Sequence, residues 1–396
     1  MGTMQKRVIY QSVAAIGLLL AVTHTPAQAR FVITPHIETT LQHNSNFFRT
    51  ETNEKSVTTW TISPGLQVIY KTAKTKATFD GTLDRFQYYG GNVASGYDYT
   101  GGRIAADIQN QVNNHLLVGM QDNMRVTRDP EYIDDVSQQV GREKYLTNVF
   151  TPHIYYAFSH DKFGIGARYQ NKMINYSEAS EDYAENRGIL NFFYNFNRST
   201  SAFLEYHIWK GEYDRFTSDY LSNKVTVNVS KQFNYFTLTA GAGYRSRTFD
   251  DSGYKNINGF TGKIMAEGRD RRDDDSDRMP RSFVTAALIH DLNDYGAGGS
   301  YYTATRLELR GGYLIGPRLG ISGLGLYQHE NYELNPNNRT DDLYVISGQV
   351  DYALIDKLSV AVEGGHRKRN SDQAGQSYDD TFIIAKLKYA YDFGHE

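Results

Sequence analysis

The sequence predicts an all-β protein: a transmembrane antiparallel β-barrel of about 18 strands, preceded by a cleaved signal peptide. Three observations lead to this prediction. Apolar and polar residues alternate with a period of two along most of the chain, and no apolar run after residue 29 is long enough for a transmembrane helix. The composition is polar on average, with a mean hydropathy of −0.56, yet it includes 31 Tyr and 35 Gly. A barrel with a wet lumen and aromatic girdles requires that combination.

The clearest strand is the last one, at 378–393. One face is apolar and ends in three aromatic residues, Tyr389, Tyr391 and Phe393, whereas the opposite face carries Lys386 and Lys388. An aromatic end of this kind is typical of a strand that leaves the membrane hydrocarbon. The segment resembles the C-terminal assembly signal of bacterial outer-membrane barrels, although three more residues follow Phe393. We therefore predict that these three aromatic residues form the assembly signal.

The start of the chain predicts export. Lys6 and Arg7 precede an apolar run at 13–22, and an Ala-x-Ala site ends at Ala29. Because that run is too short to span a membrane, we expect a signal peptide at 1–29 and a barrel at 30–396.

Cysteine is absent, which excludes disulfides and cysteine metal sites. The predicted location is the outer membrane of a Gram-negative bacterium, with outer-membrane lipid and the barrel assembly machinery as partners. A net charge of −3 gives no reason to expect nucleic acid.

Segments with strand alternation follow one another from residue 31 to the end. They are expected at 31–42, 56–70, 76–90, 97–109, 112–126, 143–158, 161–176, 184–196, 201–214, 217–231, 234–250, 253–267, 280–292, 301–315, 319–331, 341–354, 358–369 and 378–393. Tight turns alternate with longer connections, as periplasmic turns alternate with outer loops in such barrels. The charged turn at 269–281 breaks this pattern. Its Asp-rich run lacks the Gly and Glu of a calcium loop, so we expect a solvated turn.

Alternation also assigns the two faces of the wall. The residues expected to face lipid include Leu204, Tyr206, Ile208, Val225, Val227 and Val229. Charged neighbours must point inward, because a charge at mid-bilayer depth on the lipid face costs roughly 2–4 kcal/mol. The predicted pore-lining residues are Arg168, Lys172, Glu205, His207, Arg245, Arg247, Arg306, Glu308 and Arg310. They either form a charge-selective conduit or pair with one another to brace the wall.

The connection at 127–142 is the candidate constriction loop. It is the third outer loop, and it carries the acidic residues Asp129, Glu131, Asp134 and Asp135. In general porins the third loop folds into the lumen against a basic wall, which the inward arginines could supply here. An ordinary acidic surface loop is the alternative. Two aromatic residues assigned to the lumen, Trp209 and Tyr155, are candidates for stacking on sugar rings, with packing in the wall as the alternative.

The sequence contains no recognisable enzymatic motif. Its histidines are scattered, no pair has metal-ligand spacing, and neither a nucleophile elbow nor a phosphate-binding loop is present. A triad assembled across strands is invisible in sequence. We therefore expect no enzyme, no cofactor and no metal site.

Four segments near the N-terminus carry a family resemblance: Pro35–Glu38, Asn44–Phe48, Ser63–Leu66 and Asp80–Tyr89. With them the N-terminal third resembles the outer-membrane barrels encoded with exopolysaccharide and capsule export systems, the β-barrel porin 2 group. In this group the first strand ends in an Asp-Asn-like motif, which Ser45 interrupts here. The resemblance implies a conduit for secretion of exopolysaccharide, with polysaccharide and periplasmic export components as partners.

Other classes of function stay open. A general or solute-selective diffusion porin would use the same barrel, and so would a barrel enzyme or a structural surface protein. An 18-stranded barrel has a backbone diameter of about 36 Å and a lumen of about 20–25 Å. That lumen admits a hydrated glycan chain as well as small solutes, so its size does not separate these functions.

Overall fold

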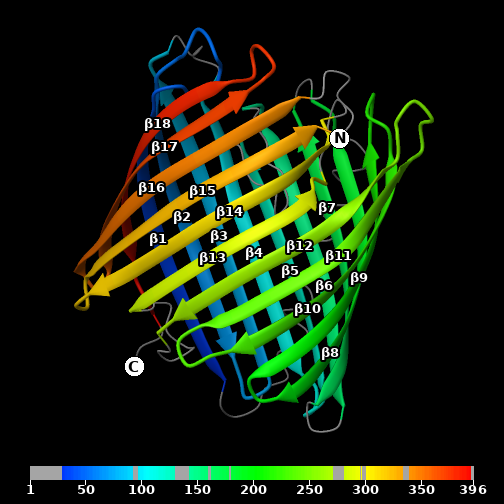
Figure 1. The fold of residues 1–396 in the computed structure, drawn as a ribbon. Coiled ribbons are helices and arrows are strands. Elements are labelled where there is room, and N and C mark those ends of the chain that lie inside the picture. The colour runs from blue at the N-terminus through cyan, green and yellow to red at the C-terminus, as the bar shows by residue number, and fades with distance from the viewer. Residues whose placement is uncertain are drawn as a thin grey trace.

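The computed structural model describes residues 29–91, 97–129, 142–158, 162–177, 180–270, 281–294, 296, 300–332 and 339–393. In these residues eighteen strands form one sheet (Figure 1). In chain order the strands are β1 (Arg30–Asn44), β2 (Val57–Lys71), β3 (Thr75–Tyr89), β4 (Tyr99–Gln111), β5 (Leu116–Thr127), β6 (Tyr145–Phe158), β7 (Phe163–Tyr176), β8 (Tyr183–Asn197), β9 (Thr200–Tyr213), β10 (Tyr220–Gln232), β11 (Thr237–Phe249), β12 (Ile257–Arg269), β13 (Ser282–Leu292), β14 (Tyr302–Ile315), β15 (Leu319–Tyr332), β16 (Thr340–Ile355), β17 (Leu358–Ser371) and β18 (Tyr378–Ala390).

The sheet closes into an antiparallel barrel. Each strand pairs with the next one along the chain, and β1 also pairs with β18. That last ladder runs from His36 opposite Ala390 to Asn44 opposite Phe382. Closure leaves no strand at a sheet edge, which is the condition for crossing lipid with strands. The predicted fold class is confirmed.

The connections define two ends of the barrel. Short turns such as β8–β9, β14–β15 and β16–β17 lie at one end, together with the start of β1 and the end of β18; we call this end the turn rim. The longer β1–β2 and β13–β14 connections lie at the opposite end, the loop rim, which is uppermost in Figure 1. The β12–β13 connection belongs to the turn rim, and its residues 271–280 lie outside the described part. Outer-membrane barrels have their short turns on the periplasmic side, so we assign the turn rim to the periplasm.

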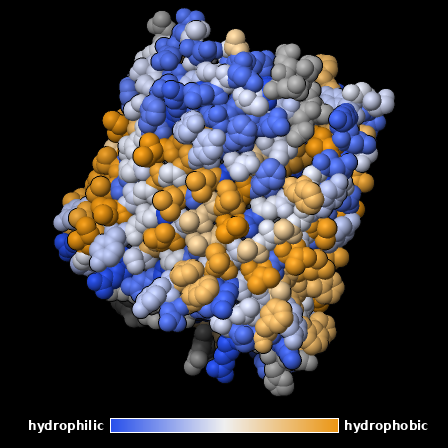
Figure 2. All heavy atoms as spheres, viewed as in Figure 1, coloured by the Kyte–Doolittle hydropathy of each residue, from blue (hydrophilic) through white to orange (hydrophobic). Residues whose placement is uncertain are grey.

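Side chains alternate between the outer wall and the lumen. Leu204 of β9 lies opposite Val227 of β10, and these side chains are 42% and 57% exposed on the outer wall. Their neighbour Glu205 points inward, where its carboxylate accepts a hydrogen bond from Asn228 at 3.1 Å. All six residues expected to face lipid are exposed on the outer wall. Figure 2 shows apolar side chains across the middle of this wall and hydrophilic ones gathered toward the loop rim.

A cysteine scan tests this assignment, because the chain has no cysteine of its own. Single cysteines at Leu204 or Val227 should resist a water-soluble thiol reagent in intact membranes. Cysteines at Glu205 or Thr226 should react several-fold faster, because water fills the lumen and is absent from the hydrocarbon. Equal labelling rates at the lipid-facing and the lumen-facing positions would contradict the assignment.

The aromatic end of β18 continues the closure of the barrel beyond the last paired strand residues. The backbone amides of Tyr391 and Phe393 donate to β1 carbonyls at 3.0 Å each, and the two rings lie 4.8 Å apart at an angle of 61°. We expect replacement of both residues by Ala to lower the amount of assembled barrel several-fold, as measured by heat-modifiable migration of outer-membrane fractions. The matched control is Phe158→Ala with Phe163→Ala, which removes another stacked pair, 5.2 Å apart. Equal losses in the two double variants would show a general girdle effect and no assembly signal.

Candidate functional site

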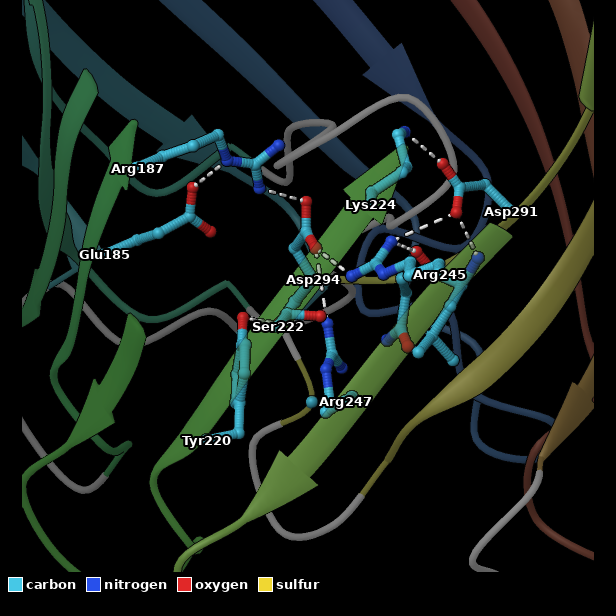
Figure 3. A network of polar contacts seen from close by, with 12 residues as sticks. Glu185, Arg187, Tyr220, Ser222, Lys224, Arg245, Arg247, Asp291 and Asp294 are labelled. Carbon is cyan, nitrogen blue, oxygen red and sulfur yellow. Dashed lines mark hydrogen bonds and ion pairs between the residues drawn. The ribbon is translucent and has the colours of Figure 1, made fainter. Parts of the chain in front are cut away.

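A basic wall lines the lumen on the inner faces of β8, β10 and β11. The cross-strand register places Arg187 of β8, Lys224 of β10, and Arg245 and Arg247 of β11 on the same inward side (Figure 3). Burial is nearly complete for Arg245 and Arg247, which are 4% and 0% exposed. Buried guanidinium groups need counter-charges close by, because a buried charge left unpaired is strongly destabilising.

The counter-charge comes from the connection that follows β13. We call residues 293–301 the inward loop, of which the structure describes Asn293, Asp294, Gly296, Ser300 and Tyr301. The Asp294 carboxylate accepts hydrogen bonds from Arg187 at 2.6 Å, from Arg247 at 3.3 Å and from Arg245. A single carboxylate therefore fastens the inward loop to β8 and β11, across the lumen face of the wall (Figure 3).

The end of β13 is fastened to the same wall. Asp291 pairs with Lys224 at 2.6 Å and with Arg245 at 3.1 Å. Arg245 also donates to the backbone carbonyl of Leu292 at 2.5 Å. The contacts with Arg245 of β11 reach past β12, and the contact with Lys224 of β10 reaches past both β11 and β12. They hold the end of β13 against the wall.

Aromatic side chains pack against the arginines. The guanidinium groups of Arg187 and Arg245 lie 4.2 and 4.6 Å from the ring centroid of Trp209, and that of Arg247 lies 3.9 Å from the ring of Tyr220. The Tyr220 hydroxyl donates to a backbone carbonyl of the inward loop at 2.8 Å. Cation–π contacts of this kind contribute about 2 kcal/mol or more when desolvated. The aromatic residues thus hold the guanidinium groups in place.

Asp294 stays ionised at neutral pH. Burial by itself raises the pKa of its carboxyl, but Arg187, Arg245 and Arg247 outweigh burial and hold the pKa well below the usual range. Asp294 belongs to the inward loop and not to a membrane-spanning strand. Its contribution to stability is complete above the unfolded-state pKa of about 3.9 and is lost as the pH falls through the lower folded-state value. The ion pairs of Asp294 with the wall are therefore not lost by protonation at neutral pH.

The other predicted pore-lining residues lie elsewhere on the inner wall. Glu308 of β14 joins Arg306 at 2.5 Å and also pairs with Arg310, so one carboxylate is shared by two arginines. Arg168 of β7 approaches Glu205 of β9 at 3.9 Å. Lys172 and His207 lie on the inner faces of β7 and β9, where Lys172 is buried. Of the predicted set, only Arg245 and Arg247 belong to the network of Figure 3.

The sequence left open whether the acidic loop at 127–142 meets the inward arginines or is an ordinary surface loop. Its Asp129 pairs with Arg142 at 3.1 Å, and Arg142 donates to the Phe47 carbonyl at 2.6 Å. Asp129 is thereby tied to the β1–β2 connection. The other three candidates, Glu131, Asp134 and Asp135, lie outside the described residues. In the described part of the chain, Asp291 and Asp294 supply the carboxylates that meet the arginines.

The two candidates for sugar stacking have different surroundings. Trp209 is 1% exposed, and two guanidinium groups lie over its ring, so no sugar reaches that ring in this arrangement. Tyr155 is half-buried on the inner face of β6, 5.8 Å from the ring of His153. Stacking on Tyr155 stays a prediction.

Sequence reasoning missed the central members of the network. Arg187 and Glu185, joined at 2.8 Å, are separated by the polar Asn186 on β8, so no apolar alternation marks them there. Asp291 and Asp294 were not singled out, although a Gly-rich run follows them directly at 296–299. Two carboxylates beside a glycine-rich connection form the only local signal that the sequence offers.

The described residues hold no group of three or more His, Cys, Asp or Glu side chains that would bind a metal ion. Within the same residues, no helix is long and apolar enough to cross a membrane.

Comparison with known families places the similarity in the C-terminal part of the chain. Residues 234–391 match the family described as "Putative beta-barrel porin 2". This stretch covers β11 to β18, whereas the segments that carry the predicted resemblance lie before residue 90. The match extends over less than half of the chain and says nothing of exopolysaccharide export. No curated protein sequence matches the chain significantly.

Solved outer-membrane barrels share the fold. The chain is similar to Acinetobacter baumannii OccAB4, with a TM-score of 0.51, 11% identity, and 93% of this chain and 99% of that chain covered. It is equally similar to Pseudomonas aeruginosa OpdK solved with vanillate (TM-score 0.51, 11% identity, 91% and 99% covered). P. aeruginosa OccK2 (OpdF) gives a TM-score of 0.51 at 11% identity, with 92% and 98% covered. At this identity the likeness concerns the fold alone.

The barrel and the comparisons together define the broad class of the protein. It is a porin-like barrel of the outer membrane of a Gram-negative bacterium. The matched family is described as porins, which are channels and not enzymes.

Replacing Asp294 with Asn tests the role of its charge. The change keeps the shape of the side chain but leaves three guanidinium groups with less compensation. We expect the stability toward urea in detergent to fall by about 3–5 kcal/mol. We also expect noisier single-channel currents, because the inward loop is released. The control is Asp107→Asn, which removes a lumen carboxylate that accepts from Gln121 at 3.1 Å. A loss of the same size in the control would contradict a special role for Asp294.

Proposed function

We propose that the protein is an outer-membrane diffusion channel for small polar solutes, with a preference for carboxylates. One observation carries the proposal: three guanidinium groups of the inner wall converge on the carboxylate of Asp294. Two of these groups have a second carboxylate, because Arg187 also pairs with Glu185 and Arg245 with Asp291. Arginine recognises carboxylates with well-directed, charge-assisted hydrogen bonds. The wall therefore has the chemistry of a carboxylate-binding surface, with an internal carboxylate already on it.

A carboxylate solute can take the place of Asp294 without a large electrostatic cost. The incoming group and the departing group carry the same charge, so the arginines stay compensated throughout the exchange. A cation is disfavoured at the same wall, because the network contains more cationic side chains than carboxylates. Its cations are Arg187, Lys224, Arg245 and Arg247, and its carboxylates are Glu185, Asp291 and Asp294.

A diffusion channel has better support than the polysaccharide conduit implied by the resemblance. The family match is to porins, and OpdK, a structural neighbour, was solved with vanillate, an aromatic carboxylate. That ligand belongs to OpdK and bears on this chain only as a precedent for the fold. The ring of Trp209, one of the two candidates for stacking on sugar rings, is buried under two guanidinium groups, which weakens the case for a glycan.

Reconstitution into planar bilayers tests the proposal. Under a gradient of sodium benzoate, the reversal potential should show that benzoate permeates better than sodium. Arg247→Gln should lower the benzoate-to-sodium permeability ratio by roughly two- to fivefold, because one of the three converging cations is lost. The matched control, Arg310→Gln, removes an inward arginine that is 52% exposed and pairs with Glu308. It should leave the ratio nearly unchanged.

Three results would contradict the proposal in different ways. A cation preference in the unaltered protein would exclude the carboxylate preference. Equal effects of the two arginine variants would assign selectivity to overall lumen charge. An absence of conductance, even in Asp294→Asn, would exclude a channel and favour a structural barrel.

A further inference from the structure

The barrel wall is incomplete between β12 and β13 near the loop rim. β12 begins at Ile257 and β13 continues to Leu292, but the ladder between them ends at Gly262 opposite His290. The ladders on either side run further: β11 pairs with β12 as far as Ile257, and β14 pairs with β13 as far as Leu292. The two strands therefore part from each other while each stays paired with its other neighbour.

The basic wall explains the separation. Asp291 pairs with Lys224 and Arg245, and the Leu292 carbonyl accepts from Arg245. These contacts lie on the lumen side and draw the last residues of β13 inward, away from β12. The ion pairs thus replace the ladder hydrogen bonds that β12 and β13 would otherwise make.

A cavity of about 310 Å³ lies at the opening, and residues of both faces of the wall line it. Its lumen end is lined by Arg245, Gly259 and Asp291. A Cβ atom added to Gly259 would have no atom within 4 Å, so this end is open space. The residues that line the cavity from the membrane side are Phe260, His290, Thr305, His329 and Asn331. We call this cavity the wall cleft.

The wall cleft opens where the outer wall changes from apolar to polar. Leu288 and Leu307 lie opposite each other on β13 and β14, and these side chains are 42% and 52% exposed to the membrane side. Two residues nearer the loop rim, His290 bonds Thr305 at 2.8 Å, and His329 lies opposite that threonine on β15. The hydrophilic region toward the loop rim in Figure 2 agrees with this change. This is the level at which lipid headgroups of the outer leaflet meet a barrel.

The cleft offers hydrogen-bond donors to an anionic ligand. His290, His329 and Asn331 carry N–H groups, which suit phosphate oxygens and sugar hydroxyls. Nδ1 of His290 bonds Thr305 at 2.8 Å and Nδ1 of His329 bonds Asp342 at 2.9 Å, so the Nε2 atom of each ring is the one left for a ligand. Among the described residues that line the cleft, Asp291 is the one carboxylate, and its oxygens are already bound to two cations.

An apolar surface adjoins the donors on the membrane side. Phe260 is 80% exposed at the edge of the cleft, and its ring packs edge-on against Tyr244 at 5.9 Å. Below it Ile264 and Leu288 are exposed on the same wall. An acyl chain can lie along these residues while its headgroup enters the cleft.

We infer that the wall cleft binds the phosphorylated glycolipid of the outer leaflet, with its sugar phosphate between β12 and β13 and an acyl chain along Phe260. The phosphate oxygens accept from the imidazoles of His290 and His329, and the sugar hydroxyls bond Asn331 and Thr305. This inference does not depend on the transported solute, so it stands or falls separately from the proposed function.

The test measures binding of bisphosphorylated hexa-acyl lipid A to the purified full-length barrel in detergent, by native mass spectrometry. The test variant is His290→Ala with His329→Ala. The matched control is His43→Ala with His366→Ala, because these outward histidines also bond a threonine through Nδ1, at 3.0 and 3.1 Å, but do not line the cleft. We expect about five- to tenfold weaker binding in the test variant, as the loss of two hydrogen bonds implies, and little change in the control.

Further measurements show which part of the lipid is bound and which part of the cleft binds it. Dephosphorylated lipid A should bind less well, and inorganic phosphate in millimolar excess should not displace the lipid. Phe260→Ala and Gly259→Leu, which remove the apolar edge and fill the lumen end, should each weaken binding; they carry the test if the double variant does not fold. Unchanged binding in these variants, equal loss in the control, equal binding of dephosphorylated lipid, or displacement by inorganic phosphate would each overturn the inference.

Discussion

Lipid accepts no unpaired sheet edge, and the organisation of this molecule follows from that constraint. Closure of β1 onto β18 satisfies it, and closure in turn divides every strand into a lipid face and a lumen face. Charged residues are then confined to the lumen or to the ends of the strands. Charged side chains from many strands meet in the lumen, and each one that is buried there needs a partner of opposite charge. The network around Asp294 is the place where this requirement is most strongly expressed.

The ion pairs that compensate the arginines also affect how neighbouring strands pair in the barrel wall. The carboxylates that reach Arg245 come from the end of β13 and from the inward loop, and no residue of β12 takes part. Because β13 is drawn inward, the ladder with β12 ends early and the wall cleft remains. The ion pairs in the lumen and the cleft in the wall therefore share one cause, the inward position of the end of β13. The charge-assisted bonds of Asp291 take the place of neutral ladder bonds at the end of β13.

The family similarity also has a structural meaning. The matched residues 234–391 include β11 and β13, which supply Arg245, Arg247 and the inward loop. The N-terminal segments that carried the predicted resemblance lie on β1 to β3, which contribute no residue to the network of Figure 3. Short motifs such as Ser63–Leu66 fit many outer-membrane strands, because turn and strand composition is shared across barrels. They are therefore a poor guide to the specific function of this chain.

The sequence by itself determined the closed barrel, its strands and the direction of most side chains. Alternation with a period of two is a local property, and lipid fixes which parity faces outward, so Val225 or Arg245 can be assigned without coordinates. The partners of the inward charges were decided only by the tertiary structure. Asp294 is 47 residues from Arg247 and 107 residues from Arg187, and every inward carboxylate was an equally plausible partner for both. The position of Asp294 chose among them. The Tyr220 hydroxyl donates to the Asp294 carbonyl and the Trp209 ring packs against Arg245, on strands that come together only when the barrel closes.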